Sequence, residues 1–385
     1  MGATIGFTGD IMSHLGFVIQ EWEGQPFREF FSEPVRQLCR AQDEMWGNLE
    51  GPARRSEDGL ALHHRAKSSG CRYPKLFFPG HYIPALVELN FKVLGIANNH
   101  SFDFETPDDT QTTNAILKEH GIAAPGLCFD PVVREVGGLS FAIIATTSFL
   151  NPPGGTRVAL ITDRTWRHLL ASVRRWRARV DYVVVMTHWG CDYQASPPSQ
   201  VRWLARELLE AGARVIYGNH PHVLWPVEQS RPDRLVCYSM GNFSQVSGCG
   251  TTCTDHSACV RPLHGGILSV EFERDRIRPI LFPIFTEENY REWFAELRLS
   301  RSYWMWTAQD LKDWKSTLPR RRLRLSSRAV RNGPPLPVPL TRRDLRELQR
   351  WMRPNAALPR TGGESLCKRA RAHDRPPATQ ARAGS

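Results

Sequence analysis

Five apolar segments of this chain end in side chains that can bind a metal ion, and this pattern restricts the folds that the sequence can adopt. The clearest segment is Val215-Ile216-Tyr217-Gly218-Asn219, which runs directly into His220-Pro221-His222. In an open α/β sheet, ligands bind at the carboxyl ends of the strands. Carboxylate, amide and imidazole groups delivered there from several strands predict a metal site with more than one ion. The five segments are residues 5–10, 45–50, 93–100, 182–188 and 215–222.

Helical periodicity alternates with the strand patterns through most of the chain. Strands that alternate with helices of this length predict βαβ units. The last strands follow one another without helices, and we expect them to pair antiparallel. The predicted helices are 26–42, 84–90, 108–120, 165–180 and 197–211, and the further strands are 139–145, 235–239, 267–272 and 278–285.

The candidate ligands extend from Asp10 to His222, so most of the 385 residues are predicted to form one domain around one site. We expect this domain over residues 1–295, a helical or irregular extension over 296–353 and a disordered basic tail over 354–385.

The net charge of +11 comes from the C-terminal end of the chain. Residues 320–385 hold 17 of the 50 Lys and Arg side chains but only 4 of the 39 Asp and Glu side chains. The body is therefore close to neutral, which disfavours a specific nucleic-acid partner. The basic tail is either a solvated extension or a point of contact with a polyanion or a membrane surface.

The chain contains no run of the roughly 18 apolar residues that a membrane helix requires. No charged start followed by an apolar signal core is visible either. We therefore expect a soluble, cytoplasmic protein. Cys249, Cys253, His256 and Cys259 form a local cluster, but their spacing is unusual for zinc. We predict a loop of free thiols there, with a structural zinc site as the alternative.

The order and spacing of the motifs resemble the CapA family, the poly-γ-glutamate capsule biosynthesis proteins of the metallophosphoesterase superfamily. The resemblance implies an α/β fold, a four-layer αββα sandwich in which two mixed sheets pack face to face with helices outside. Asn219 stands where a His is common in the family, and Asp192 stands where Glu is usual. The matching motifs are Gly9-Asp10-Ile11-Met12, Gly47-Asn48-Leu49-Glu50-Gly51-Pro52, Ala97-Asn98-Asn99-His100 with Asp103, His188-Trp189-Gly190 with Tyr193, Gln200, His220-Pro221-His222-Val223 with Glu228, and Tyr238-Ser239-Met240-Gly241-Asn242-Phe243.

By this resemblance, two divalent ions would lie about 3.5–4 Å apart and activate a water molecule between them. Asp10 and His222 would bind one ion, and Asn99, His188 and His220 would bind the other. Glu50, or alternatively Asn48, would supply the oxygen that the two ions share. Manganese, iron or zinc would suit this mixed set of ligands. The implied metal ligands are Asp10, Glu50, Asn99, His188, His220 and His222.

The resemblance also implies catalytic and substrate-binding roles. His100 would donate a proton to the leaving group, and Asp103 would orient its ring. The implied substrate contacts are Asn48, Asp192 and Asn242. The resulting hypothesis is a metal-dependent hydrolase that cleaves a phosphoester or a γ-glutamyl amide in an anionic substrate or polymer. The alternative is a non-catalytic accessory protein that binds a polyanion during capsule polymer synthesis or export.

Each candidate also has a structural interpretation. Asp10 could cap a turn, His188 could be a hydrogen-bonded histidine at a strand end, and Glu50 could pair with Arg54 or Arg55. Asn242 could hold a neighbouring loop through an Asx-type bond. We favour the metal for His220 and His222, because two histidines that flank a proline after a buried strand are hard to explain without a ligand.

Overall fold

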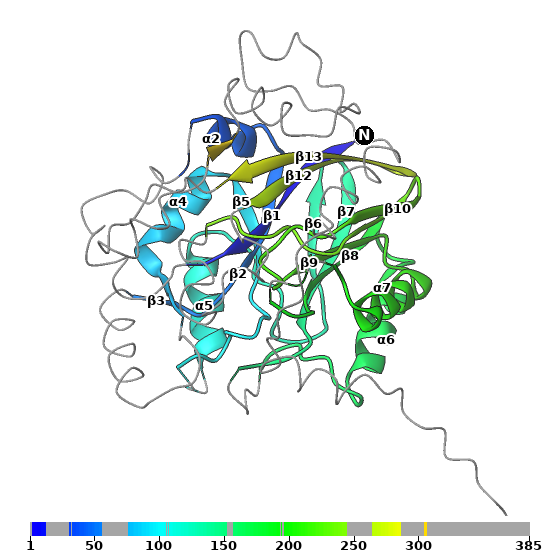
Figure 1. Ribbon diagram of the computed structural model, residues 1–385, viewed down its shortest axis with the longest axis horizontal. Helices are drawn as coiled ribbons and strands as arrows, with labels where there is room; N and C mark the ends of the chain where they lie inside the picture. Colours follow the sequence, from blue (N-terminus) through cyan, green and yellow to red (C-terminus); the bar gives the residue numbers. More distant parts are fainter. Residues whose placement is uncertain are drawn as a thin grey trace, which may run out of the picture.

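Two six-stranded sheets pack face to face and carry their helices on the outside (Figure 1). The computed structural model describes residues 2–12, 31, 33–55, 76–104, 106, 108–151, 157–192, 194, 196–244, 264–285 and 304–305. In the first sheet the strand order is β14-β13-β12-β1-β2-β5, and in the second it is β10-β11-β9-β8-β7-β6.

In the first sheet, β1, β2 and β5 run parallel, whereas β12 pairs antiparallel with β1 and with β13. The bounds are β1 Ala3–Ile11, β2 Glu44–Leu49, β5 Phe91–Gly95, β12 His264–Glu273, β13 Arg276–Phe285 and β14 Trp304–Met305. A separate pair of short parallel strands, β3 Ala53–Arg54 and β4 Phe78–Pro79, lies beside this sheet.

In the second sheet, β7, β8, β9 and β11 run parallel, and the edge strands β6 and β10 are antiparallel to their neighbours. All seven residues of β8 are buried, because this sheet is covered on both faces. The bounds are β6 Val132–Val136, β7 Leu139–Thr147, β8 Tyr182–His188, β9 Val215–Asn219, β10 Val227–Arg231 and β11 Arg234–Cys237.

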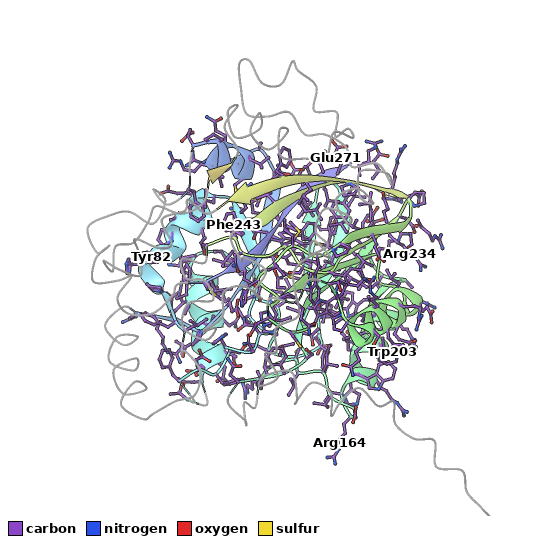
Figure 2. All side chains as sticks on the ribbon, in the orientation of Figure 1. Tyr82, Arg164, Trp203, Arg234, Phe243 and Glu271 are labelled. Carbon is purple, nitrogen blue, oxygen red and sulfur yellow. The ribbon has the colours of Figure 1, made fainter. Side chains whose placement is uncertain are left out.

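The helices cover the two outer faces. The first sheet packs against α2 Glu33–Arg40, α4 Ile83–Glu88 (preceded by the 3₁₀ turn η2 Gly80–Tyr82) and α5 Asp109–Glu119. The second packs against α6 Trp166–Trp176 and α7 Ser199–Ala211. On that side Trp203 and Arg164 lie at the outer surface (Figure 2).

Aromatic side chains fill the space between the two sheets. Trp46 of the first sheet is fully buried, and its ring meets Phe141 of the second sheet edge-on at 5.5 Å. Phe7 contacts Trp46 and also Tyr217 on β9, at 5.5 and 5.2 Å. Such pairs contribute about 0.5–1.5 kcal/mol each beyond their buried area. With helices outside and this core inside, the expected four-layer αββα sandwich is confirmed.

Gly9 lets the segment after β11 approach the end of β1. A Cβ atom at Gly9 would lie 2.2 Å from the carbonyl oxygen of Gly241. The backbone N–H of Asp10 donates to that same oxygen at 2.9 Å. This close contact places Asn242 beside Asp10, where the two residues form an isolated parallel bridge.

Some sequence-based expectations need correction. The late strands were expected to pair antiparallel with one another, which holds for β12 with β13. It is wrong for the strand predicted at 235–239, because β11 lies in the other sheet, parallel to β9 and antiparallel to β10. Within the predicted helix 26–42, α2 occupies only Glu33–Arg40, and residues 26–30 and 32 are outside the described residues. The strands β6 and β10 were not predicted, because short, partly exposed edge strands lack a buried apolar run.

The predicted cysteine loop 249–259 and the tail 354–385 lie outside the described residues, as does the extension 296–353 except for 304–305. Tyr193 is also outside them. Where the chain is described, every helix is too short or too polar for a membrane crossing.

Candidate metal centre

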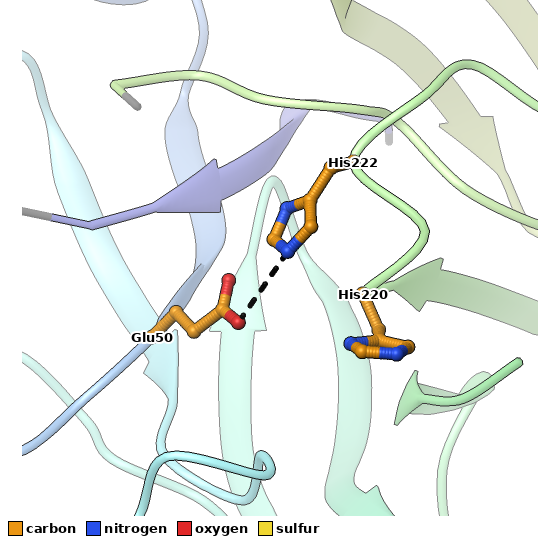
Figure 3. A group of neighbouring side chains, drawn as sticks. All are labelled: Glu50, His220 and His222. Atoms are coloured by element: carbon orange, nitrogen blue, oxygen red, sulfur yellow. Dashed lines mark ion pairs between the residues drawn. The ribbon is translucent and has the colours of Figure 1, made fainter. Parts of the chain in front are cut away.

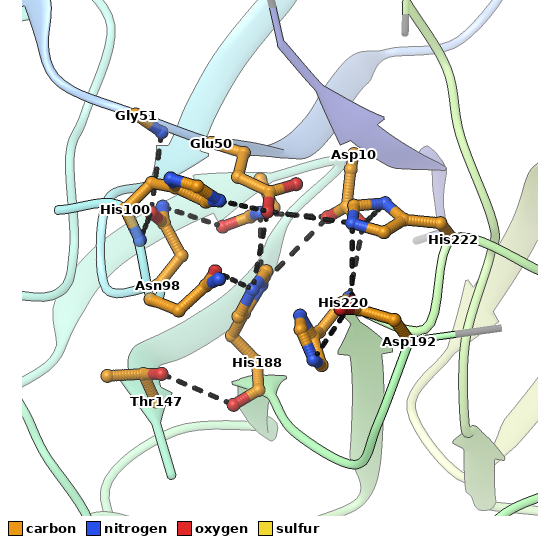
Figure 4. A network of polar contacts seen from close by, with 12 residues as sticks. Asp10, Glu50, Gly51, Asn98, His100, Thr147, His188, Asp192, His220 and His222 are labelled. Atoms are coloured by element: carbon orange, nitrogen blue, oxygen red, sulfur yellow. Dashed lines mark hydrogen bonds and ion pairs between the residues drawn. The ribbon is translucent and has the colours of Figure 1, made fainter. Parts of the chain in front are cut away.

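The carboxyl ends of parallel strands from both sheets meet at one buried place (Figure 4). Asp10 lies near the end of β1, Glu50 follows β2 directly, and His188 is the last residue of β8. All predicted metal ligands and both predicted catalytic residues lie there, each at most 7% exposed. They are Asp10, Glu50, Asn99, His100, Asp103, His188, His220 and His222.

The turn after β9 has an unusual backbone. His220 and His222 have φ angles of 99° and 57°, in the left-handed region that residues other than glycine rarely adopt. Such conformations cost on the order of 1–3 kcal/mol each and are found where function requires them. The N–H of His220 donates to Oδ2 of Asp10 at 3.1 Å, which ties this turn to the first sheet.

Glu50 lies at the centre of the site. Its Oε1 is 3.7 Å from Nε2 of His188, 3.8 Å from Nε2 of His222 and 3.9 Å from Nε2 of His100. Within the described residues, neither carboxylate oxygen accepts a hydrogen bond, although the side chain is fully buried. A buried carboxylate without hydrogen bonds is stable only when it is protonated or when a positive charge lies beside it. Arg54 does not supply this charge, because it pairs with Asp109.

The electrostatics of the protein atoms alone show where a positive charge is favoured. Burial and the neighbouring Asp10 raise the pKa of Glu50 well above its usual value. Burial on its own lowers the pKa of His222, but Glu50 and Asp10 outweigh it and raise that pKa to about 10. Burial lowers the pKa of His188 well below its usual value and that of His220 to about 4. The site therefore favours a cation among Glu50, Asp10 and His222, and keeps the other two imidazoles neutral, as metal binding requires.

Neighbouring amides hold these groups in place. Asn48 donates to Oδ1 of Asp10 at 2.9 Å, and Oδ1 of Asn242 accepts from Nδ1 of His222 at 2.9 Å. The second contact directs Nε2 of His222 towards Glu50. Hydrogen bonds of this kind fix the orientation of metal-binding side chains.

The segment after β5 provides two side-chain amides: that of Asn99 lies in the site, and that of Asn98 binds backbone groups. Oδ1 of Asn99 lies 2.7 Å from Nε2 of His188. Asn98 donates to the carbonyl of Leu49 at 2.7 Å and accepts from the N–H of Gly51 at 3.3 Å. Asn98 therefore holds the backbone of the segment after β2.

His100 and Asp103 form a buried pair in the same segment. Nδ1 of His100 lies 2.6 Å from Oδ2 of Asp103, which also accepts the N–H of Leu76. This contact leaves Nε2 of His100 facing Glu50. The ring is thus oriented by a carboxylate on one side and presented to the centre of the site on the other.

Sequence comparison assigns the family. Residues 4–246 match the family described as "Bacterial capsule synthesis protein PGA_cap". The chain belongs to this family. The PGA_cap match includes every residue of the buried site.

Two curated relatives have capsule-related names. The "PGA biosynthesis protein CapA" of Bacillus subtilis (strain 168) is 28% identical over 271 residues, covering 66% of this chain and 66% of the relative. The "Capsule biosynthesis protein CapA" of Bacillus anthracis is 27% identical over 270 residues, covering 67% of this chain and 63% of the relative. This PGA_cap chain therefore spans slightly less than two thirds of the length of each relative.

Glu50, His220 and His222 each offer a ligand atom, and these atoms lie within 4.8 Å of one another (Figure 3). The resemblance had divided His220 and His222 between two ions, whereas this spacing allows one ion to be held by both. The orphaned Glu50 oxygens and the neutral imidazole of His220 fit a divalent cation, and the raised pKa of His222 shows that positive charge is favoured at the same place. The donor set of this PGA_cap protein thus suits a metal-dependent protein.

The predicted substrate contacts occupy different places. Asn48 and Asn242 are buried and their amides orient Asp10 and His222, as described above. Asp192 is exposed and lies beside the two histidines that follow β9. The contact of these three residues with substrate stays a prediction.

Two residues of the loop after β7 were missed. Asn151 makes two hydrogen bonds to Asn99: its backbone N–H donates to the carbonyl of Asn99 at 2.9 Å, and its Oδ1 accepts from Nδ2 of Asn99 at 3.3 Å. The Nδ2 atom of Asn151 lies 3.3 Å from both ring nitrogens of His100. Phe149 packs edge-on against His220, with ring centroids 4.6 Å apart. Only part of the signal was in the sequence: Asn151 comes four residues after the end of an apolar strand, as Asn99 does, but its contacts with the other half of the site were not visible there.

Proposed function

We propose that this PGA_cap-family protein is a metal-dependent hydrolase whose site holds two divalent ions. The carrying observation is Glu50, a fully buried carboxylate without a hydrogen bond among the described residues and surrounded by three imidazoles. Asp10 brings a second buried carboxylate to within 3.3 Å of His222. A site of this composition is stable only when positive charge is present.

The distances suggest how the ligands are shared. Asn99 and His188 approach each other and face one side of Glu50, whereas His220 and His222 face another. Glu50 is placed to serve both groups, because its Oε1 lies 3.7 Å from Nε2 of His188 and 3.8 Å from Nε2 of His222. When bound, the ions would supply the Lewis acidity that activates water and stabilises charge on the attacked centre.

The remaining residues supply binding and proton transfer. His100 is proposed to give a proton from Nε2 to the leaving group, because Asp103 holds its Nδ1 and stabilises the protonated ring. We propose an anionic substrate, with a phosphoester or a γ-linked glutamyl amide as the bond cleaved. The superfamily chemistry supports the phosphoester, and the printed names of the Bacillus relatives support the polymer.

The test measures metal content and turnover on the purified chain. We expect about two ions per chain after incubation with manganese or zinc, and metal-dependent hydrolysis of either an aryl phosphodiester or a γ-glutamyl oligomer. Glu50→Gln keeps the shape but removes the charge, so we expect loss of both metal and turnover. Metal bound without turnover on either substrate class would favour the polyanion-binding alternative, and no bound metal would refute the proposal.

The pH dependence of the metal-free protein provides a separate prediction. The raised pKa of His222 gives stability that is present below pH 6.5 and lost as the pH rises through about 10. The raised pKa of Glu50 acts in the same direction, because its unfolded form ionises above pH 4.5. His188 and His220 have lowered pKa values, so their contribution to stability changes mainly around the ordinary value of 6.5 and below, and little above about pH 7.5.

We therefore expect the free energy of unfolding of the metal-free protein to fall between pH 7 and pH 10. Metal affinity should rise over the same interval, because binding displaces protons from the site. Denaturant titrations with chelator, and calorimetric titrations in buffers of different ionisation enthalpy, measure the two effects. A metal-free stability that rises over this interval would contradict the prediction.

A further inference from the structure

Asp192 lies in the loop after β8, four residues beyond His188. Its Oδ1 is 3.3 Å from Nε2 of His220 and 3.8 Å from Nε2 of His222 (Figure 4). The side chain is 55% exposed, so packing does not force it into this place. In the described part of the chain, its ion-pair partners are these two imidazoles.

These separations are those of ligands around a common ion. Nitrogen and oxygen ligands lie about 2.0–2.2 Å from zinc in a tetrahedral site, so neighbouring ligand atoms are about 3.4 Å apart. Asp192 meets this spacing with both histidines, and His222 meets it with Glu50 at 3.8 Å. Both histidine contacts are made through Nε2. In His222 the other ring nitrogen is bound to Asn242.

The charges agree with this geometry. Once metal binding has displaced the protons of the site, Glu50 and Asp192 would offer two carboxylates to a divalent ion held beside two neutral imidazoles. Glu50 approaches from the buried side and Asp192 from the exposed side. Their two carboxylates would therefore enclose the ion between the interior and the solvent.

We propose that Oδ1 of Asp192 is a ligand of the metal ion held by Glu50, His220 and His222. This assignment rests on the proposed metal-dependent function. It replaces the substrate contact predicted from the sequence, because Asp192 faces ring nitrogens that would bind metal. It also gives this ion four protein ligands, two from the first turn after β9 and one from each carboxylate.

The test is a titration of the metal-free full chain with Zn²⁺ and Mn²⁺ by calorimetry. The variants are Asp192→Asn and Asp192→Ala, with Asp163→Asn as the control, because Asp163 is an exposed acid before α6 and away from the site. We expect Asp192→Ala to weaken the metal affinity of one of the two sites about 10- to 100-fold and to leave the affinity of the other site unchanged. Asp192→Asn should fall between it and the wild type.

A second measurement detects the ligand directly. Co²⁺ bound to the wild type and to Asp192→Ala should give different visible absorption spectra, because the variant loses one protein ligand. The melting temperature of the metal-free variant should stay within the range of the control, since the side chain is exposed. This check separates a lost ligand from a damaged fold.

Each outcome decides the question. Wild-type affinity and an unchanged Co²⁺ spectrum in Asp192→Ala would refute the ligand role, and a raised KM in that variant would return Asp192 to substrate binding. A wild-type chain that binds no metal would refute the proposed function, and the ligand role with it. Weakened binding in Asp163→Asn as well would show a general charge effect and also count against the proposal.

Discussion

Replacing His220 and His222 together with alanine is expected to reduce bound metal to less than half of the wild-type content and turnover by at least about 100-fold. Both rings are buried, and each offers a ligand atom within 4.8 Å of a Glu50 carboxylate oxygen. Their removal takes away one imidazole that faces both Asp10 and Glu50 and one that shares the ion with Glu50, and leaves His188 and His100 near the carboxylates. Elemental analysis and initial rates on the same preparations measure the effect.

The matched control is the double variant His120→Ala/His168→Ala. It removes two exposed histidines outside the site and should change neither quantity. Loss of a buried charged partner can cost about 3–5 kcal/mol, so the site variant must first be shown to fold by circular dichroism. The single variant His220→Ala serves if the double variant is unfolded, because it leaves His222 beside both carboxylates. Metal content equal to that of the control in a folded variant would rule out these histidines as ligands.

Replacing His100 with alanine or asparagine is expected to lower kcat by about 100- to 10,000-fold while metal content stays at the wild-type value. His100 faces Glu50 at 3.9 Å but is held by Asp103, which suits a proton donor next to the metal ligands. Asp103→Asn should produce a smaller loss, because the ring remains but its orienting charge does not.

The choice of substrate makes this second prediction specific. A proton donor matters most when the leaving group is strongly basic, so the defect of His100→Ala should shrink for a nitrophenyl ester and grow for an alkyl ester. Rates for a series of leaving groups, compared between wild type and variant, measure this dependence. An equal defect across the series would show that His100 does not protonate the leaving group, and loss of metal would make it a ligand.

The sequence located the site because its polar side chains lie at the ends of strands that have the strongest apolar patterns. Asp10, Glu50, His188 and His220 each terminate or follow a strand whose residues are almost entirely buried. Such strands have continuous apolar sequences, so the polar residue that ends each of them is easy to recognise. The layering of the two sheets came from the family resemblance, since no periodicity of a single strand encodes which sheet it joins.

The remaining features depend on contacts between distant segments. Arg234–Cys237 has the same apolar pattern whether it pairs parallel or antiparallel, so its position beside β9 could not be deduced from the run itself. Asn151 follows β7 after three intervening residues, and its importance arises from Asn99 and His100 in the other half of the site. The left-handed backbone of His220 and His222 was also invisible, because neither residue is glycine.

The site is divided between the two sheets. Asp10, Glu50 and Asn99 come from strands of one sheet, and His188, His220 and His222 come from strands of the other. A bound ion would therefore link the two sheets, and neither sheet alone provides the full set of ligands. Assembly of the sheets has to precede metal capture during folding, so the chain would acquire its ions as the final step of maturation and a partly folded chain would not sequester metal.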